Sequence, residues 1–525
     1  MHEFIAKHRN KIAGILSGFD RLVFRGTLRS LSYVDGMRHY LAANGVLLKD
    51  FGSHVERMSK QLKDASLGLA QQLKRPHKFL SSPKDSKEEI AQEIVAKEGI
   101  RDGLICVLTS IEPCRSYDIH RNRETKKLEL VSRYRKCLFI YQYWMHPQFG
   151  FMNARIQTWF PFPIQICMNG RMWLGRQMDR AGIQYAAADN CFPWIGDWNK
   201  AQRLMDQQLR TNWPKALEPI AQKLNPAHGE MFKKYPVSHY WSTYQSEWAI
   251  DTVFQKAEEL RRLFPRLVHH GITTFSCTDV MRYLGKPTLL SGEVPRRFSG
   301  DVVSDIKHRE EGVRIKHMIN GNSVKLYDKA YTTPGSVLRA ETTVHNGSDF
   351  RVYRPKEGEP DGKKSWRRMR RGIADLNRRA EVSRKSAERY LNAYANVEDE
   401  TTLEELIRKL GQPAYLKDRR VRALRPFADD SKLLDAISRG DFMINGLRNR
   451  DLQGIFFPSA PTSIEEARRR SAWVSRQLRL LRAHGLITKI NGTHRYQLTT
   501  SGRKITTAIL SALRATIRQL TPIAA

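Results

Sequence analysis

The chain has 525 residues with 89 Lys+Arg against 54 Asp+Glu, which gives a formal net charge of +35 at pH 7. This length exceeds one ordinary hydrophobic core and predicts two to four domains, while a hydrophobic fraction of 41% excludes a wholly disordered chain. The strong positive charge favours a polyanionic partner, and nucleic acid, DNA or RNA, is the first candidate. The sequence has no apolar run long enough to span a bilayer and no apolar leader at its N-terminus, so we expect a cytoplasmic protein without a membrane partner.

Composition shifts predict an α+β multidomain chain, with mixed strand-rich core domains followed by a basic α-helical region and a small C-terminal domain. The five predicted regions are an N-terminal α+β region (1–100), an aromatic-rich α+β domain (101–235), an α+β domain with a three-stranded meander (236–356), a basic helical linker region (361–428) and a C-terminal domain (429–525). Six cysteines are scattered without a C-x-x-C pair, so neither a zinc knuckle nor a disulfide framework is indicated.

The first half of the chain alternates between helical and strand patterns. The loosely alternating GFDRLVFRGTLRSL, at 18–31, is typical of an edge strand with basic residues turned outward. Residues 137–160 form two apolar runs around the turn HPQFG and predict central strands of a sheet. Helical patterns occur at 35–45, 53–75, 164–181, 198–211 and 244–263.

One polar line interrupts the apolar strands at 137–160. Asn153, Arg155 and Gln157 alternate, so they share one face of their strand. Polar groups in a buried strand need partners. These three residues predict either a polar groove that binds a nucleotide or a structural hydrogen-bond ladder.

Two carboxylates in SHYWSTYQSEWAIDTVF are candidates for a metal site. Glu247 and Asp251 are four residues apart and would share one face of the predicted helix, and His239 precedes them. A nuclease or nucleotidyl transferase needs two or more carboxylates to hold Mg²⁺. These three residues are therefore candidate catalytic residues, although two acids on an exposed helix can also face the basic domains. No other cofactor is indicated.

The segment GVRIKHMINGNSVKLYDK predicts a hairpin whose register can be worked out. Asn320-Gly321 is typical of a type I′ turn, which sets His317 opposite Val324 and Ile315 opposite Leu326. The hairpin then has an apolar face that also carries Asp328, and a basic face that includes Lys325 and Lys329. We expect these two lysines to contact phosphate.

A third strand follows the Pro334-Gly335 turn. Leu338, Ala340 and Val344 match the apolar face of the hairpin, which puts Glu341 and Arg339 on its basic face. Asp328 and Glu341 are therefore predicted to lie on opposite faces rather than to form a metal pair. Asp328 remains a candidate catalytic residue because no partner for it is evident.

The strand pair KLYDK…LRAET resembles a piece of rolling-circle replication initiators of phages and plasmids. That resemblance covers about 25 residues and implies Tyr327 as a nucleophile. Those enzymes hold their metal with a His-hydrophobic-His motif, and none of the sixteen histidines here has that spacing. The implied chemistry therefore requires another set of ligands.

The linker region from 361 to 390 is rich in lysine and arginine. Such runs contact successive phosphates of a nucleic acid backbone and make nucleic-acid binding salt-dependent. A single run is often only the solvent-exposed face of a helix. The residues expected to bind nucleic acid here are Lys363, Lys364, Arg367, Arg368, Arg370 and Arg371.

The C-terminal domain shows two helical patterns and then IEEARRRSAWVSRQLRLLRAHGLITKINGTHRYQLTTSGRK. Gly485 closes the third helix, and Asn491-Gly492 joins two short strands. This order resembles the winged helix-turn-helix of MarR- and ArsR-type regulators over about 90 residues, which implies a recognition helix in the major groove and a wing on the backbone. Residues expected to contact nucleic acid are Arg468, Arg469, Arg476 and Arg479 on the helix and Lys489, His494 and Arg495 on the wing. Such domains also dock on proteins.

The sequence thus favours a nucleic-acid-binding protein in a mobile-element, replication or ribonucleoprotein setting. The alternatives are an enzyme, either a metal-dependent nuclease or an integrase-like or replication-initiating protein, and a transcription regulator. The sequence does not indicate an oligomeric state.

Overall fold

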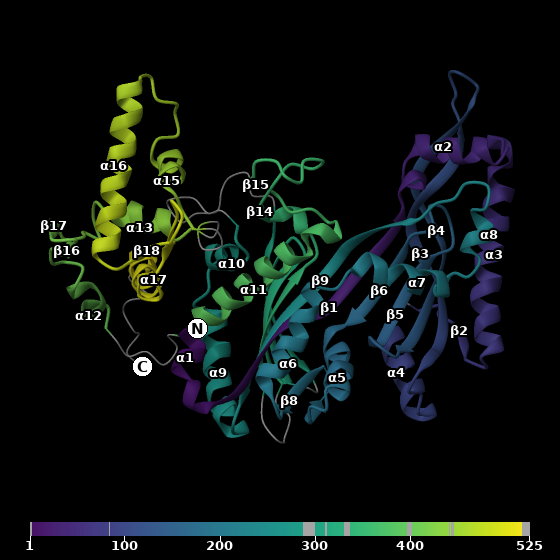
Figure 1. Ribbon diagram of the computed structural model, residues 1–525, viewed down its shortest axis with the longest axis horizontal. Coiled ribbons are helices and arrows are strands. Elements are labelled where there is room, and N and C mark those ends of the chain that lie inside the picture. Colours follow the sequence, from purple (N-terminus) through teal and green to yellow (C-terminus); the bar gives the residue numbers. More distant parts are fainter. Residues whose placement is uncertain are drawn as a thin grey trace.

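The computed structural model describes residues 3–82, 85–188, 190–286, 300–309, 312–329, 337–395, 402–439, 442 and 446–516. The predicted turn at Pro334-Gly335 lies outside these residues. The fold is mixed α+β, as predicted, and its centre is one eleven-stranded sheet that draws strands from all three predicted N-terminal regions (Figure 1).

The strand order in this sheet is β10-β11-β12-β13-β9-β1-β6-β5-β4-β3-β2. All neighbours are antiparallel except β2 and β3. The strands are β1 (Ile12–Leu28), β2 (His77–Phe79), β3 (Gly103–Arg121), β4 (Leu128–His146), β5 (Gly150–Gln157), β6 (Ile164–Asn169), β9 (His239–Phe254), β10 (Val302–Arg309), β11 (Gly312–Ile319), β12 (Asn322–Lys329) and β13 (Val337–Val344).

Four two-stranded sheets surround the large one. They are β7 (Tyr185–Ala188) with β8 (Cys191–Ile195), β14 (Arg351–Arg354) with β15 (Ser365–Arg368), β16 (Ala414–Leu416) with β17 (Arg419–Val421), and β18 (Ile487–Lys489) with β19 (Tyr496–Leu498). The helices of the N-terminal 395 residues are α1 (Glu3–Lys7), α2 (Val34–Ala43), α3 (Phe51–Gln72), α4 (Lys87–Glu98), α5 (Gly170–Arg180), α6 (Trp198–Met205), α7 (Trp213–Leu224), α8 (His228–Met231), α9 (Ala257–Thr273), α10 (Cys277–Tyr283) and α11 (Leu376–Ala393).

Helices cover both faces of the sheet. Over the apolar face, α2, α3, α7 and α8 pack on one half and α9, α10 and α11 on the other, each group around its own hydrophobic cluster (Figure 1). On the opposite face, α4 packs against β3 and β4, and α5 and α6 pack against β1. This second face is the one that carries the polar residues described below.

Strand β1 lies at the centre of the sheet, so the predicted edge strand at 18–31 is wrong. It pairs with β6 on one side and with β9 on the other. Gly14 and Gly18 allow α6 to approach, because a Cβ at either position would overlap the side chain of Trp198 or Met205. The outward basic residues that suggested an edge lie instead on the polar face of a central strand.

Three segments predicted as helical also need correction. Residues 239–254, which include most of the predicted helix at 244–263, form strand β9, and α9 begins only at Ala257. The pattern at 164–181 contains strand β6 before helix α5. Residues of the basic linker at 365–368 form strand β15 rather than helix. In each case pairing with a neighbouring strand outweighs local helix propensity.

The predicted meander register is confirmed. His317 pairs with Val324 and Ile315 with Leu326, as the Asn-Gly turn requires. In β13, Glu341 pairs with Lys325. Asp328 pairs with Leu338 and therefore lies on the opposite face from Glu341.

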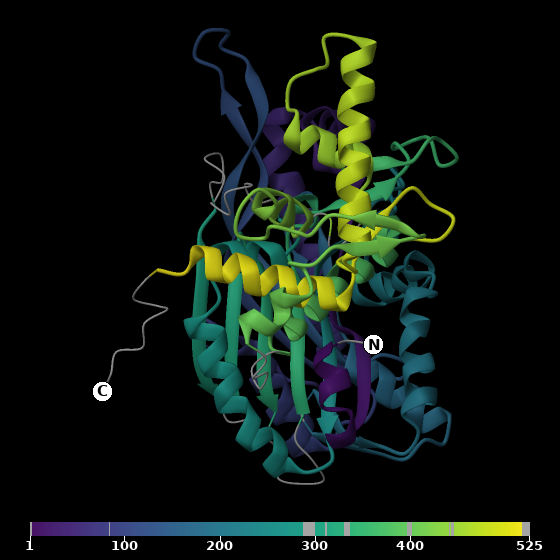
Figure 2. The same ribbon diagram turned by 90° about the vertical axis from the view of Figure 1, so that its left-hand side faces the viewer.

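The C-terminal part of the chain forms a separate hydrophobic cluster beside the sheet core. Its helices are α12 (Leu403–Arg408), α13 (Ser431–Ile437), α15 (Asn449–Phe456), α16 (Ile464–Ala483) and α17 (Thr500–Arg514). Gly485, with φ +69°, ends α16 as predicted. Figure 2 shows α17 lying across the top of the core helices, while α16 projects away from the sheet.

Among the residues that the structure describes, no helix combines the length and the apolar character needed to cross a bilayer.

Candidate metal site on the polar face of the sheet

Charged side chains from adjacent strands meet on one face of the sheet. Directly paired residues of neighbouring strands point to the same side. On this basis Lys325, Glu341 and Ala249 share a face, and so do Thr343, Glu247 and Arg21. The same face continues through Cys167 of β6 to Asn153 of β5. A polar surface thus runs across six strands, from β12 to β5.

A β-bulge turns an additional carboxylate into this face. The β1–β9 register shifts between Phe19 and Arg21, so Asp20 is the extra residue on β1. Bulges bend a strand and redirect a side chain. Asp20 therefore points to the polar face, toward the ion pairs that Asp251 and Glu341 form. Its neighbour Arg21 faces the same side.

The inner part of the site is a closed ion-pair network. Arg339 of β13, which is fully buried, binds both oxygens of Asp251 at 2.6 and 2.9 Å and Asp20 Oδ2 at 3.2 Å. Arg171 Nη2 lies 2.8 Å from Asp251 Oδ2. Burial opposes ionisation of Asp251, but Arg171 and Arg339 outweigh it and hold the pKa of this carboxyl below its usual value. Asp251 is therefore fully committed to two arginines.

Local sequence explains how Arg171 reaches this network. Asn169, the last residue of β6, caps α5 by accepting hydrogen bonds from the Arg171 and Met172 N–H groups, each at 2.9 Å. Gly170 lets α5 approach β1 closely, since a Cβ there would lie 1.7 Å from the Phe19 carbonyl oxygen. The first turn of α5 is thereby held against the bulge.

In the outer part of the site, the positive charge of one lysine lies near two glutamates. Lys325 Nζ lies 2.5 Å from Glu341 Oε1 and 3.9 Å from Glu247 Oε1. Burial, together with the charge of Glu341, raises the pKa of Glu247 to about 7. Arg21 is paired with Glu247 in the register, but its Nε donates to Cys167 Sγ at 3.1 Å. Among the described residues, the cation nearest to Glu247 is therefore Lys325, at 3.9 Å, and Lys325 lies closer to Glu341.

Three carboxylates converge closely enough to hold a cation. One oxygen from each of Asp20, Glu247 and Glu341 lies within 4.8 Å of the other two. Asp20 is 4% exposed, and burial raises its pKa despite Arg339 and Arg171. Its Oδ1 accepts no hydrogen bond from the residues that the structure describes and lies 3.7 Å from Arg171 Nε. Oxygen ligands with an unsatisfied carboxylate among them suit a hard divalent cation such as Mg²⁺.

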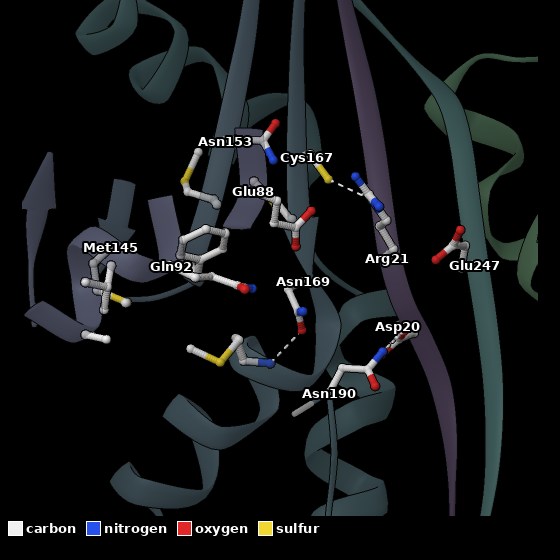
Figure 3. Close-up of a pocket in the computed structure, with 16 residues that line it drawn as sticks. Asp20, Arg21, Glu88, Gln92, Met145, Asn153, Cys167, Asn169, Asn190 and Glu247 are labelled. Carbon is white, nitrogen blue, oxygen red and sulfur yellow. Dashed lines mark hydrogen bonds between the residues drawn. The ribbon is translucent and has the colours of Figure 1, made fainter. Parts of the chain in front are cut away.

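A pocket of about 350 Å³ opens beside these carboxylates (Figure 3). Asp20, Arg21 and Glu247 form one wall, and Glu88 and Gln92 of α4 form the facing wall. In Figure 3 the Glu88 side chain points into the middle of the pocket, toward Cys167 and Arg21. The pocket therefore borders two of the three carboxylates, Asp20 and Glu247, whereas Glu341 is not among its lining residues.

The structure brings some of the predicted catalytic residues together and separates others. Glu247 and Asp251 do share a face, on a strand rather than a helix. His239 lies at the start of β9, about 26 Å from Glu247 along the strand, and its Nδ1 is 3.3 Å from Glu218 Oε1. Asp328 lies on the apolar face, where burial raises its pKa to about 6. Neither His239 nor Asp328 belongs to the carboxylate cluster.

Sequence reasoning missed four members of the network: Asp20, Glu341, Arg171 and Arg339. Glu341 and Arg339 were placed on the correct face but were not recognised as partners of β9 and β1. For Asp20 the available signal was a lone carboxylate within the apolar run around Phe19 and Leu22. Arg171 gave no signal, because a surface helix commonly carries arginine.

The predicted polar line on β5 divides between two roles. Asn153 lines the pocket. Arg155 Nη2 pairs with Glu112 Oε2 at 2.7 Å, whereas the buried Gln157 donates to the Trp159 and Phe160 carbonyls. Arg155 and Arg371 also lie near Arg25, whose pKa is lowered by burial and by these two charges. Cationic side chains therefore gather around Arg25.

Several of the residues expected to bind nucleic acid are open to solvent. They are Lys363, Lys364, Arg368, Arg371, Arg468, Arg469, Arg476, Arg479, Lys489 and His494. Others are engaged with protein: Arg370 pairs with Asp375, and Arg495 lies over the rings of Tyr353 and Trp366 at 5.0 and 5.1 Å. Arg367 is half-buried in β15, and Lys329 is buried.

Comparisons with protein-family models, with curated proteins and with solved structures found no match for this chain.

Proposed function

We propose that this chain is a nucleic-acid-binding enzyme that cleaves phosphodiester bonds with a divalent cation held by Asp20, Glu247 and Glu341. The observation that carries the proposal is the convergence of these three carboxylates, from three adjacent strands, beside an open pocket. Such a cation, when bound, polarises a phosphoryl oxygen and lowers the pKa of a bound water. The net charge of +35 favours a polyanionic substrate.

The residues around the cluster have distinct roles in this proposal. Lys325, 2.5 Å from Glu341, supplies a fixed positive charge where negative charge develops on the phosphate. Arg339 and Arg171 hold Asp251 and orient Asp20, so they position the cluster without touching substrate. The raised pKa of Glu247 makes loading of the cation compete with a proton near pH 7.

A basic surface provides a path for the nucleic acid backbone. Arg371 and Arg25 lie beside the polar face, and Arg371 is close to the end of β9 through the hydrogen bond from Thr243 N to its carbonyl. A separate hollow on the β14–β15 hairpin is lined by five cations, among them Arg351 and Lys356, and by one acid, Glu357. Phosphate contacts of this kind position a strand without reading its sequence.

We further propose that residues 429–525 form a winged helix-turn-helix that binds duplex nucleic acid. Support comes from the order α13, α15, α16, β18, β19 and from the exposed arginines on α16. In this arrangement α16 enters the major groove and the β18–β19 hairpin contacts the backbone. The resemblance to replication initiators is compatible with a replication or mobile-element setting.

Cleavage assays test the catalytic proposal. Labelled duplex DNA, single-stranded DNA and structured RNA are incubated with Mg²⁺ or Mn²⁺, comparing the wild type with Glu247→Gln and Glu341→Gln. We expect cleavage of at least one substrate and a loss of about a hundredfold or more in each variant, since a metal ligand is removed.

Asp328→Asn is the matched control, because Asp328 is a half-buried carboxyl on the opposite face of the same sheet. It should cleave like the wild type. No cleavage of any substrate with either metal, or equal cleavage by all variants, would remove the catalytic proposal while leaving nucleic-acid binding to be judged by its own salt dependence.

A further inference from the structure

A second cavity, of about 280 Å³, lies far from the carboxylate cluster, between the sheet core and the C-terminal helices. One wall comes from α10 and α11 and the other from α17, which Figure 2 shows lying across the core. Phe275 and Tyr283 supply aromatic surface. Four cations, Arg282, Arg389, Arg503 and Lys504, line the cavity with only two carboxylates, Glu3 and Asp279.

Arg389 is a buried cation that forms no salt bridge with a carboxylate among the described residues. It is 5% exposed, and its Nε donates to the Arg282 and Tyr283 carbonyls at 3.1 Å each. Its Nη2 donates to Ser386 Oγ at 2.9 Å and also to the Tyr283 carbonyl. Nη1 has no hydrogen-bond partner within the described parts of the chain. Burial of a charge that lacks an ion pair is costly unless something else neutralises it.

Arg503 brings a second positive charge to the same cavity. Its Nε is also buried without a hydrogen-bond partner among the described residues. Burial and, to a lesser extent, the charge of Arg503 together lower the pKa of Arg389 to about 9, while Glu388 opposes this shift. Two guanidinium groups from α11 and α17, more than a hundred positions apart in sequence, therefore repel one another across the cavity.

Acids near the cavity offset this excess only in part: Glu3 and Glu388 favour the charged form of Arg503, but burial still lowers its pKa. Asp279 accepts hydrogen bonds from Ser276 N and Oγ at the start of α10 and lies 3.4 Å from Arg282. Arg282 is also 3.4 Å from Asp435, which in turn pairs with Arg514. Arg282 is thus satisfied by carboxylates, whereas Arg389 is not.

We propose that this cavity binds a small phosphate monoester, with Arg389 and Arg503 donating to the phosphate oxygens and Phe275 and Tyr283 contacting the organic remainder. Guanidinium groups match the geometry of phosphate oxygens, and charge-assisted hydrogen bonds are the strong ones. The bound phosphate neutralises the repulsion between α11 and α17. It therefore ties the C-terminal helices to the core. The proposal does not depend on the catalytic one.

Calorimetric titration of the full chain tests the site with three probes: inorganic phosphate, AMP and adenosine. We expect phosphate and AMP to bind and adenosine not to bind. Arg389→Gln and Arg503→Gln should each weaken AMP binding about tenfold or more, as expected for loss of one charge-assisted contact. Arg378→Gln is the matched control on the same helix, because Arg378 already pairs with Asp375 at 2.8 Å.

A thermal unfolding series separates a ligand site from a merely structural arginine. AMP should raise the unfolding temperature of the wild type and of Arg378→Gln but not of Arg389→Gln. The proposal is overturned if adenosine binds as tightly as AMP, if neither phosphate nor AMP binds, or if both cavity variants bind AMP like the wild type.

Discussion

The substitution Glu247→Gln tests the charge balance of the carboxylate cluster most directly. Burial, together with the charge of Glu341, raises the pKa of Glu247 from its ordinary 4.5 to about 7. At a pH between these two values, Glu247 keeps its proton in the folded chain and releases it in the unfolded chain. Stability therefore falls as pH rises through this window, because the folded state binds more protons than the unfolded state.

The size of the effect follows from the shift. Each unit of pKa corresponds to about 1.4 kcal/mol, so a shift of roughly 2.5 units predicts a loss of about 3 kcal/mol between pH 4.5 and pH 7. Glutamine stays neutral throughout. We therefore expect Glu247→Gln to gain about 3 kcal/mol relative to the wild type on going from pH 5 to pH 8.

Differential scanning calorimetry of both proteins across this pH range measures the effect, with the difference between their unfolding temperatures as the readout. Titrating groups away from the carboxylate cluster are common to both proteins and cancel in the difference. Saturating Mg²⁺ should also stabilise the wild type above pH 7, since a bound cation holds Glu247 ionised, and should do less for the variant. A temperature difference that stays constant from pH 5 to pH 8 would refute the reasoning.

Three further substitutions have defined outcomes. Gly170→Ala places a Cβ 1.7 Å from a β1 carbonyl and should cost about 3 kcal/mol or more by calorimetry, whereas Gly229→Ala, with open space around it, should cost little. Arg339→Met leaves two buried carboxylates without their main cation and should destabilise the fold by about 3–5 kcal/mol. Arg476→Gln should lower the slope of log affinity against log salt for duplex DNA by about one, while Arg470→Gln should not, because Arg470 pairs with Glu466 at 2.6 Å. Equal salt slopes for the two variants would contradict a backbone role for α16.

The sequence by itself determined the local geometry of the meander. Asn320-Gly321 fixes a two-residue turn, and the period of two in a strand then assigns every side chain to a face. That is why Asp328 and Glu341 could be placed on opposite faces without a structure. Residues four positions apart share a face both in a helix and in a strand. The prediction that Glu247 and Asp251 share a face was therefore correct, although the predicted helix is a strand.

Only the tertiary structure decided which strands are neighbours. Asp20 meets Glu247 and Glu341 because β1 pairs with β9 and β9 with β13, across more than 200 residues of chain between Asp20 and Glu247. No local pattern specifies such a pairing or the bulge that turns Asp20 into the cluster. The buried arginines follow the same rule: Arg171 and Arg339 look like surface residues in sequence, and they become the centre of the site only when long-range packing removes water and leaves carboxylates as their partners.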